Sequence, residues 1–266
     1  MHLHRALTFP IILLLASAAI PLRAQLGAPN ASGVSVGHVH LTVRDVEAHK
    51  KLWVLLGGEV THSGTLEMLK FPGLFVLLTA GQPSDGSDGS TVDHFGLMVK
   101  NLDAIRAKLT AEGLPTVQER DNPRRWTTLF PDKVKVEFTE DPTLKVPVAG
   151  HHLHLATTDV EALRSWYVKT FGGAPEVRRG FVSAVFNGGE VNLLAMPEPR
   201  APTKGRAIDH IGFEVQGLEA FCRKLEAAGV KFDTPFRDVP RIGLKLAFLT
   251  DPVGTRIELT EGLAAH

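Results

Sequence analysis

The sequence predicts an α+β protein of four repeated βαβββ modules, paired into two tandem domains. Four stretches follow one plan: a histidine, a short alternating apolar run, a polar stop, an amphipathic helix and a glycine. They cover residues 37–58, 93–113, 150–173 and 209–229. Further short apolar runs follow each stretch, so the unit recurs at about 50–60 residues. One such unit cannot bury both faces of its sheet, which means that the modules must pack in pairs.

The chain has 266 residues, enough for one large core or two ordinary ones. Lysine plus arginine equals aspartate plus glutamate, at 29 each. A neutral chain lacks the basic field that binding to nucleic acid or to an anionic membrane surface requires. Cys222 is the single cysteine, so an intrachain disulfide is excluded.

Residues 1–24 have the pattern of a secretory signal peptide: a basic start, the apolar run TFPIILLLASAAI, and a small residue at Ala24. Retention as an uncleaved anchor is the alternative. After cleavage the protein would have no membrane anchor and would be periplasmic or secreted. Residues 25–35, rich in Gly, Ala, Pro and Ser, are expected to form a mobile lead-in.

The first domain is predicted over residues 36–140. Its first strand begins at His38, and Asp45 and Asn101 are the predicted N-caps of its two helices. Glycines after each apolar helical stripe mark the helix ends. The remaining strands are expected over residues 65–71, 74–80, 93–99, 116–118, 127–130 and 133–139.

The second domain is predicted over residues 150–262, after a linker at 141–149. Its two modules run from His151 to Met196 and from Arg206 to Glu261. The turn at Asp251–Gly254 precedes the last strand, which covers Thr255–Thr260.

Residues two apart on a strand share a face, so His152 and His154 should lie together while His151 points to the other face. His210 is equivalent to His152 in the next module, and Glu258 lies on the last strand. Two imidazoles and a carboxylate form a facial triad for a divalent metal such as Fe(II), Mn(II), Ni(II) or Zn(II). The sequence thus suggests that His152, His210 and Glu258 form one set.

The N-terminal half offers an equivalent set, namely His38, His94 and Glu137. Two complete sets in register are less expected by chance than one isolated pair. A histidine on a strand can instead be a hydrogen-bonded structural residue, and this reading stays open for both sets.

The segments HHLHLATTDVEALRSWYVKTFGG and DHIGFEV, together with FLTDPVGTRIEL, resemble the vicinal oxygen chelate superfamily. This group includes glyoxalase I, type I extradiol dioxygenases, fosfomycin-resistance metallotransferases and metal-free bleomycin-resistance proteins. The resemblance covers roughly residues 36–262. It implies that paired modules close a cup-shaped barrel around a metal, with the histidines and glutamates named above as ligands.

The sequence departs from this superfamily at two places. The fourth ligand of glyoxalase I-like enzymes would fall at Asn192 or Val76, neither of which is a carboxylate. The tyrosine that extradiol enzymes place about ten residues before the glutamate is replaced by Phe248. The only tyrosine, Tyr167, is expected on a helix.

His154 and His40 each follow a proposed ligand by two residues, where relatives often touch substrate. Each could act as a general base or hydrogen-bond donor, or could orient a ligand instead. Two arginine pairs stand at residues 124–125 and 178–179. They could line the mouth of a cup and hold an anionic substrate, or they could lie on a solvated strand edge.

These observations predict an exported metal-dependent enzyme of the glyoxalase or dioxygenase type, a monomer or homodimer acting on a small oxygenated substrate. The alternative is a metal-free protein that binds a small molecule, as the bleomycin-resistance proteins do. The missing tyrosine and fourth ligand favour this alternative.

Overall fold

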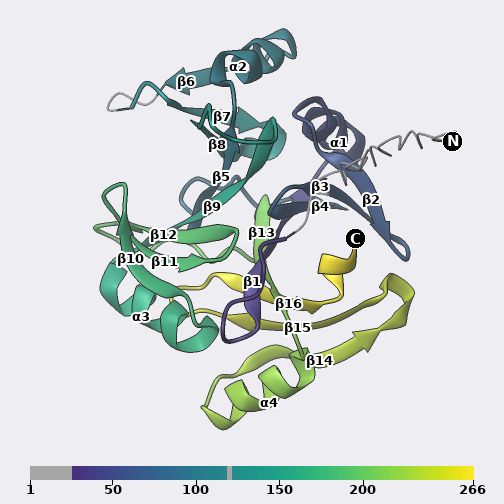
Figure 1. The fold of residues 1–266 in the computed structure, drawn as a ribbon, viewed down its shortest axis with the longest axis vertical. Helices are drawn as coiled ribbons and strands as arrows, with labels where there is room; N and C mark the ends of the chain where they lie inside the picture. Colours follow the sequence, from purple (N-terminus) through teal and green to yellow (C-terminus); the bar gives the residue numbers. More distant parts are fainter. Residues whose placement is uncertain (1–25, 119–121) are drawn as a thin grey trace, which may run out of the picture.

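The computed structural model describes residues 26–118 and 122–266 (Figure 1), so the predicted signal peptide at 1–24 lies outside the described residues. The predicted fold class is confirmed, because four βαβββ modules build two eight-stranded mixed sheets. Within the described ranges, no helix has the length and hydropathy needed to cross a bilayer.

The modules follow one another along the chain with the same order of elements. Module 1 contains β1 (Val34–Val43), α1 (Val46–Leu55), β2 (Glu59–Ser63), β3 (Leu66–Phe71) and β4 (Leu74–Ala80). Module 2 contains β5 (Val92–Val99), α2 (Leu102–Ala111), β6 (Thr116–Gln118), β7 (Arg125–Phe130), the short η1 (Pro131–Lys133) and β8 (Val134–Glu140). Module 3 contains β9 (Val148–Thr157), α3 (Val160–Phe171), β10 (Ala174–Arg178), β11 (Phe181–Phe186) and β12 (Gly189–Ala195). Module 4 contains β13 (Ile208–Val215), α4 (Leu218–Ala227), β14 (Phe232–Val239), η2 (Pro240–Ile242), β15 (Leu244–Thr250), β16 (Arg256–Glu261) and η3 (Leu263–Ala265).

The predicted helix starts are confirmed at both caps of the first two modules. The Asp45 carboxylate accepts a hydrogen bond from the Ala48 amide at 2.9 Å, and the Asn101 side chain accepts one from Ala104 at the same distance. Each cap satisfies one of the amides that a helix leaves unpaired in its first turn. The helices therefore start where the short polar side chains place them.

The pairing of the modules differs from the order along the chain. One sheet runs β14-β15-β16-β13-β1-β4-β3-β2, and the other runs β10-β11-β12-β9-β5-β8-β7-β6. Module 1 thus pairs with module 4 through β1 and β13, and module 2 pairs with module 3 through β5 and β9. We call the inner faces of these two sheets cup A and cup B. Each cup takes strands from both predicted domains, so the expectation that consecutive modules close one cup was wrong.

The lead-in that the composition predicted to be mobile is held against the fold. The Asn30 side chain donates to the carbonyls of Phe171 and Gly172 at 3.0 Å each, and accepts from the amides of Ser32 and Val34. β1 accordingly begins at Val34, four residues earlier than the histidine-led pattern suggested. The lead-in thus covers the carboxyl end of α3.

The main apolar core lies behind the cups and joins the two sheets. Trp53 of α1 packs on Phe130 and Phe95 of module 2, with ring centroids 4.6 and 5.6 Å apart. Phe171 of α3 stacks on Phe213 of module 4 at 4.7 Å. Because these aromatic contacts cross between modules of different sheets, the core holds the two sheets together.

Candidate metal centres

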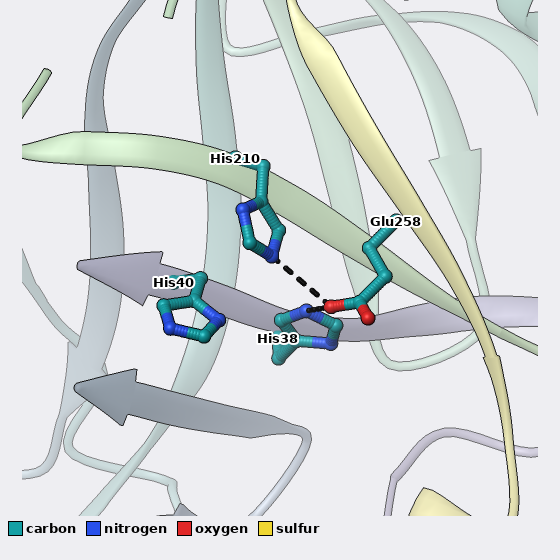
Figure 2. A group of neighbouring side chains, drawn as sticks. All are labelled: His38, His40, His210 and Glu258. Carbon is teal, nitrogen blue, oxygen red and sulfur yellow. Dashed lines mark hydrogen bonds and ion pairs between the residues drawn. The ribbon is translucent and has the colours of Figure 1, made fainter. Parts of the chain in front are cut away.

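Four side chains converge in cup A: His38 and His40 from β1, His210 from β13 and Glu258 from β16 (Figure 2). One atom of each lies within 4.8 Å of the others. Glu258 Oε2 is 3.0 Å from both His38 Nε2 and His210 Nε2. His40 Nε2 is 2.7 Å from the hydroxyl of Thr79.

Four equivalent side chains converge in cup B: His94 from β5, Glu137 from β8, and His152 and His154 from β9. His94 Nε2 lies 3.0 Å from His154 Nδ1 and 3.4 Å from both His152 Nε2 and Glu137 Oε2. All four residues are buried. Each cup therefore holds three imidazoles and one carboxylate, a donor set suited to Fe(II), Mn(II), Ni(II) or Zn(II).

Sheet register explains why these side chains meet over one point. Gly96 of β5 pairs with His152 on one side and with Glu137 on the other. In cup A, Gly212 stands in the same way between His38 and Glu258. A glycine in the middle of the row leaves a space over which the imidazole and the carboxylate can lean together.

An aspartate fixes the orientation of one histidine in each cup. Asp93 Oδ1 lies 2.6 Å from His94 Nδ1, and Asp209 Oδ1 lies 2.6 Å from His210 Nδ1. Neighbouring strand residues normally point to opposite faces of a sheet. Asp93 and Asp209 are exceptions, because each lies at a bulge where its strand has one residue more than the partner strand. An Nδ1–H donated to the aspartate leaves the Nε2 lone pair directed at the shared centre, the arrangement usual for metal-bound histidine.

The remaining imidazoles are held in the neutral form that metal binding requires. Burial lowers the pKa of His38 and, more strongly, the pKa of His152. Burial also lowers the pKa of His40 and of His154 to about 3 each, and the nearby histidines act in the same direction. Three ring nitrogens in these clusters are buried with no partner among the described residues: His38 Nδ1, His40 Nδ1 and His154 Nε2.

Each carboxylate and its closest histidine shift the pKa of one another. Burial alone would raise the pKa of Glu137 and Glu258, but hydrogen bonds and charge from the adjacent histidines outweigh it and lower both values. For His94, burial would lower the pKa, yet Asp93 and Glu137 together raise it. Both glutamates are therefore ionised at neutral pH, the state in which a carboxylate can bind a metal ion.

The predicted ligand residues all lie in these clusters, but their grouping was wrong. We expected His152, His210 and Glu258 to form one set. The structure places His152 in cup B, while His210 and Glu258 lie in cup A.

The equivalent correction applies to the other set. His38 joins His210 and Glu258, and His94 with Glu137 joins His152. The exchange follows directly from the pairing of module 1 with module 4 and of module 2 with module 3. His40 and His154, predicted beside the ligands, each contribute a nitrogen to the cluster of their cup.

His151 does not point away from cup B as strand alternation predicts. Between the pairs Gly96–His152 and Leu97–Gly150, β9 carries one residue more than β5, and His151 is that residue. This bulge turns its ring toward the cup, where Nδ1 is 2.9 Å from Nδ1 of His152. Its Nε2 is 3.0 Å from the guanidinium of Arg179.

The two cups differ in the strand beside the first histidines. In cup A, His38 and His40 pair with Phe75 and Leu77. These side chains form an apolar cluster that includes Leu26 and Leu263, from the two ends of the described chain. The inner face of cup A is therefore packed next to its histidines.

In cup B the same two places are polar, because His152 pairs with Glu190 and His154 pairs with Asn192. A cavity of about 260 Å³ opens there. Its lining residues are Asn122, Arg125, Glu137, Thr139, His151, His152, His154, Arg179, Phe181 and Asn192. Cup B thus has room for a small molecule beside its histidines.

The sheet register shows which of the two expected fourth-ligand positions, Val76 and Asn192, faces a cup. Val76 pairs with Val39 and is buried in the main core behind the cup, so it does not face the cluster. Asn192 does face cup B, next to His154. Sequence reasoning missed Glu190, a buried carboxylate beside His152 that contacts Arg179. Phe248, at the place of the missing tyrosine, packs its ring 5.2 Å from that of His210 in cup A.

Comparison with known proteins agrees with this architecture. Residues 150–259 match the model of the Glyoxalase/Bleomycin resistance protein/Dioxygenase superfamily. Glyoxalase I from Zea mays superposes with a TM-score of 0.66 at 15% identity, covering 86% of this chain and 92% of its own. A Bacillus subtilis protein assigned as a possible dioxygenase superposes with a TM-score of 0.64 at 16% identity, covering 90% of this chain and 86% of its own.

A sequence search of curated proteins finds no match. The resemblance to the vicinal oxygen chelate superfamily is nevertheless confirmed, on the family match over residues 150–259 and on a glyoxalase-like fold over most of the chain. At these identities the structural likeness shows the fold, and the chemistry must be argued from the cups.

Proposed function

We propose that the protein is a metal-dependent enzyme of the glyoxalase or dioxygenase type whose active site is cup B. The observation that carries this proposal is the cavity beside His94, Glu137, His152 and His154. A divalent ion held by these groups would chelate two neighbouring substrate oxygens and stabilise negative charge that develops on them. Cup A has an equivalent cluster but is packed with apolar side chains.

The residues of cup B fit such an ion on three grounds. The donor set is three imidazoles and a carboxylate, and Asp93 orients His94 from behind. Gly96 provides the space in which the ring of His152 lies. The Nε2 atom of His154 is buried without a partner among the described residues, which is costly for a nitrogen that has no function.

The chain's own residues would position the substrate. Phe181 forms one wall, with its ring 4.6 Å from that of His154. Asn192 and Thr139 add hydrogen-bonding groups to the lining. His154, kept neutral by burial, can offer a lone pair either to the metal or to a substrate hydroxyl.

The test uses the matched pair Glu137→Gln in cup B and Glu258→Gln in cup A. Purified protein is stripped with a chelator, reloaded separately with Mn(II), Fe(II), Ni(II) or Zn(II), and titrated calorimetrically with catechol as a probe with two adjacent oxygens. Loaded wild type should bind catechol, Glu137→Gln should lose this binding, and Glu258→Gln should keep it.

Catechol binding that survives both metal removal and Glu137→Gln would refute the proposal and favour the metal-free binding protein instead. We also propose, from the pattern of residues 1–24, that the protein is exported to the periplasm or secreted. Sequencing the amino terminus of protein recovered from its native compartment tests this, and a retained Met1 would contradict it.

A further inference from the structure

Two arginines reach the cavity of cup B from different modules. Arg125 stands at the start of β7, and Arg179 occupies the turn between β10 and β11. The Arg125 guanidinium lies over the ring of Phe181 at 6.0 Å, and its Nε is 3.7 Å from Glu137. Arg179 contacts Glu190 and His151. Both guanidinium groups therefore stand close to the proposed metal ligands.

Both arginines stand against carboxylates of the cavity wall. Arg125 lies 3.7 Å from Glu137, and Glu190 is shared between Arg179 and Arg178. A divalent ion at Glu137 would add two positive charges beside these guanidinium groups. In a partly buried pocket the added positive charge favours an anionic ligand, since the surrounding dielectric screens it poorly.

The backbone of Arg179 indicates that its position serves more than the turn. Arg178 pairs with Phe181, so Arg179 and Gly180 form a two-residue hairpin turn in which both have positive φ, 51° and 86°. Asn-Gly is the favoured pair for such a turn, and arginine is a disfavoured residue at its first place. Disfavoured backbone conformations of this kind gather at functional sites.

From these observations, and resting on the metal-dependent function proposed above, we infer that cup B takes a small organic anion. This ligand carries a carboxylate held by Arg125 and Arg179, two adjacent oxygens for the metal, and a planar apolar part against Phe181. Guanidinium groups suit this task because they can donate paired hydrogen bonds to a carboxylate.

The test compares two probes that differ in one charge. 3,4-Dihydroxybenzoate and 3,4-dihydroxybenzamide carry the same adjacent hydroxyls on the same ring, but only the first has a carboxylate. Calorimetric titration of the metal-loaded wild type should give a dissociation constant about 10- to 100-fold lower for the benzoate, the range expected for charge-assisted hydrogen bonds. The double variant Arg125→Gln/Arg179→Asn should bind both probes equally.

Arg124, one residue from Arg125, and Arg223 of α4 provide a control variant. Both lie outside the cavity lining, and Arg223 pairs with Glu219, so Arg124→Gln/Arg223→Gln should keep the preference for the benzoate. Asn suits the turn at residue 179, so the double variant should fold, and its thermal unfolding checks this.

The outcomes separate the two hypotheses. If neither probe binds in a metal-dependent manner, the proposed function fails. If both probes bind with the metal but equally well to wild type, or if the double variant keeps the preference, the metal site stands and the arginine pocket is refuted.

Discussion

Gly96 lies directly opposite His152 across the seam of cup B, and the imidazole fills the space that a side chain would take. A Cβ on Gly96 would stand 2.1 Å from Cε1 of His152. Gly212 has the same relation to His38 in cup A, at 2.0 Å. These contacts are far too close for any side chain, so the positions of His152 and His38 each depend on one glycine in the partner module.

Gly96→Ala should therefore empty cup B while sparing cup A. The methyl group must push the ring of His152 off the shared centre, because both strands are fixed by their sheet neighbours. Metal analysis after stripping and reloading should show the loss of about one equivalent relative to wild type.

Gly212→Ala is the reciprocal control, since it should empty cup A and leave the ion of cup B. In each variant, the ion retained by the unchanged cup shows that the protein still folds around one intact cluster. Full metal content in Gly96→Ala would show that His152 is not a ligand.

Asp93→Asn should weaken metal binding in cup B without changing the ligands themselves. The neutral amide no longer stabilises the His94 orientation through charge, and loss of such a partner typically costs about 10- to 100-fold in affinity. Competition with a chromophoric chelator measures the change. Asp233→Asn is a suitable control, because the Asp233 carboxylate accepts a hydrogen bond from the Thr250 hydroxyl within module 4, which belongs to cup A. Unchanged affinity in Asp93→Asn would remove the orienting role.

His49 should make the metal-free protein less stable as the pH falls. This buried residue of α1 faces Asp132 at 3.3 Å, and burial lowers its pKa despite that carboxylate. The unfolded chain takes up a proton near pH 6.5, before the folded chain does. The free energy of unfolding should consequently decrease below pH 6.5, by up to about 1.4 kcal/mol per pH unit for this proton, until the folded pKa is passed.

Urea unfolding of chelator-treated protein between pH 5 and 8 measures this slope. His49→Phe should reduce this slope by the contribution of one proton, while the other buried histidines whose pKa is lowered keep the rest of it. His62→Gln, at an exposed histidine, should leave the slope as in wild type. Equal slopes in all three proteins would mean that His49 is protonated alike in the folded and unfolded states.

Asn30→Ala should destabilise the fold by about 1–3 kcal/mol, the usual cost when buried or half-buried backbone groups lose their partners. The side chain makes four hydrogen bonds, two to α3 and two within the lead-in. Asn187→Ala removes only one long contact, to Pro29 at 3.4 Å, and serves as the control. Thermal unfolding of both variants provides the comparison, and equal midpoints would contradict the role of Asn30.

The local structure could be predicted from the sequence because its signals are local. The caps at Asp45 and Asn101 and the alternating strands depend on residues a few positions apart. The pairing of modules could not be predicted in this way. Four copies of one pattern are equally complementary to each other, and the choice among partners depends on the path of the whole chain. Every residue of the two clusters was therefore named from the sequence, but grouped with the wrong partners.

Two features of the candidate site escaped prediction because they depend on bulges. Asp93 and Asp209 precede a ligand histidine, and strict alternation would turn them away from it. His151 enters the cup for the same reason. The motif Asp-His-x-Gly at residues 93–96 and 209–212 contains both the orienting carboxylate and the glycine. The recurrence of this motif is the sequence signal from which the orienting aspartate and the glycine could have been predicted.

The nested pairing of modules has a consequence for how the chain reaches its native state. His154 pairs with His94 only 60 residues away, so cup B can close as soon as the middle of the chain is complete. His40 pairs with His210, 170 residues further along, and β1 must wait for nearly the whole polypeptide. Because distant pairings form more slowly than near ones, the inner sheet should assemble first and act as the template on which both chain ends then join.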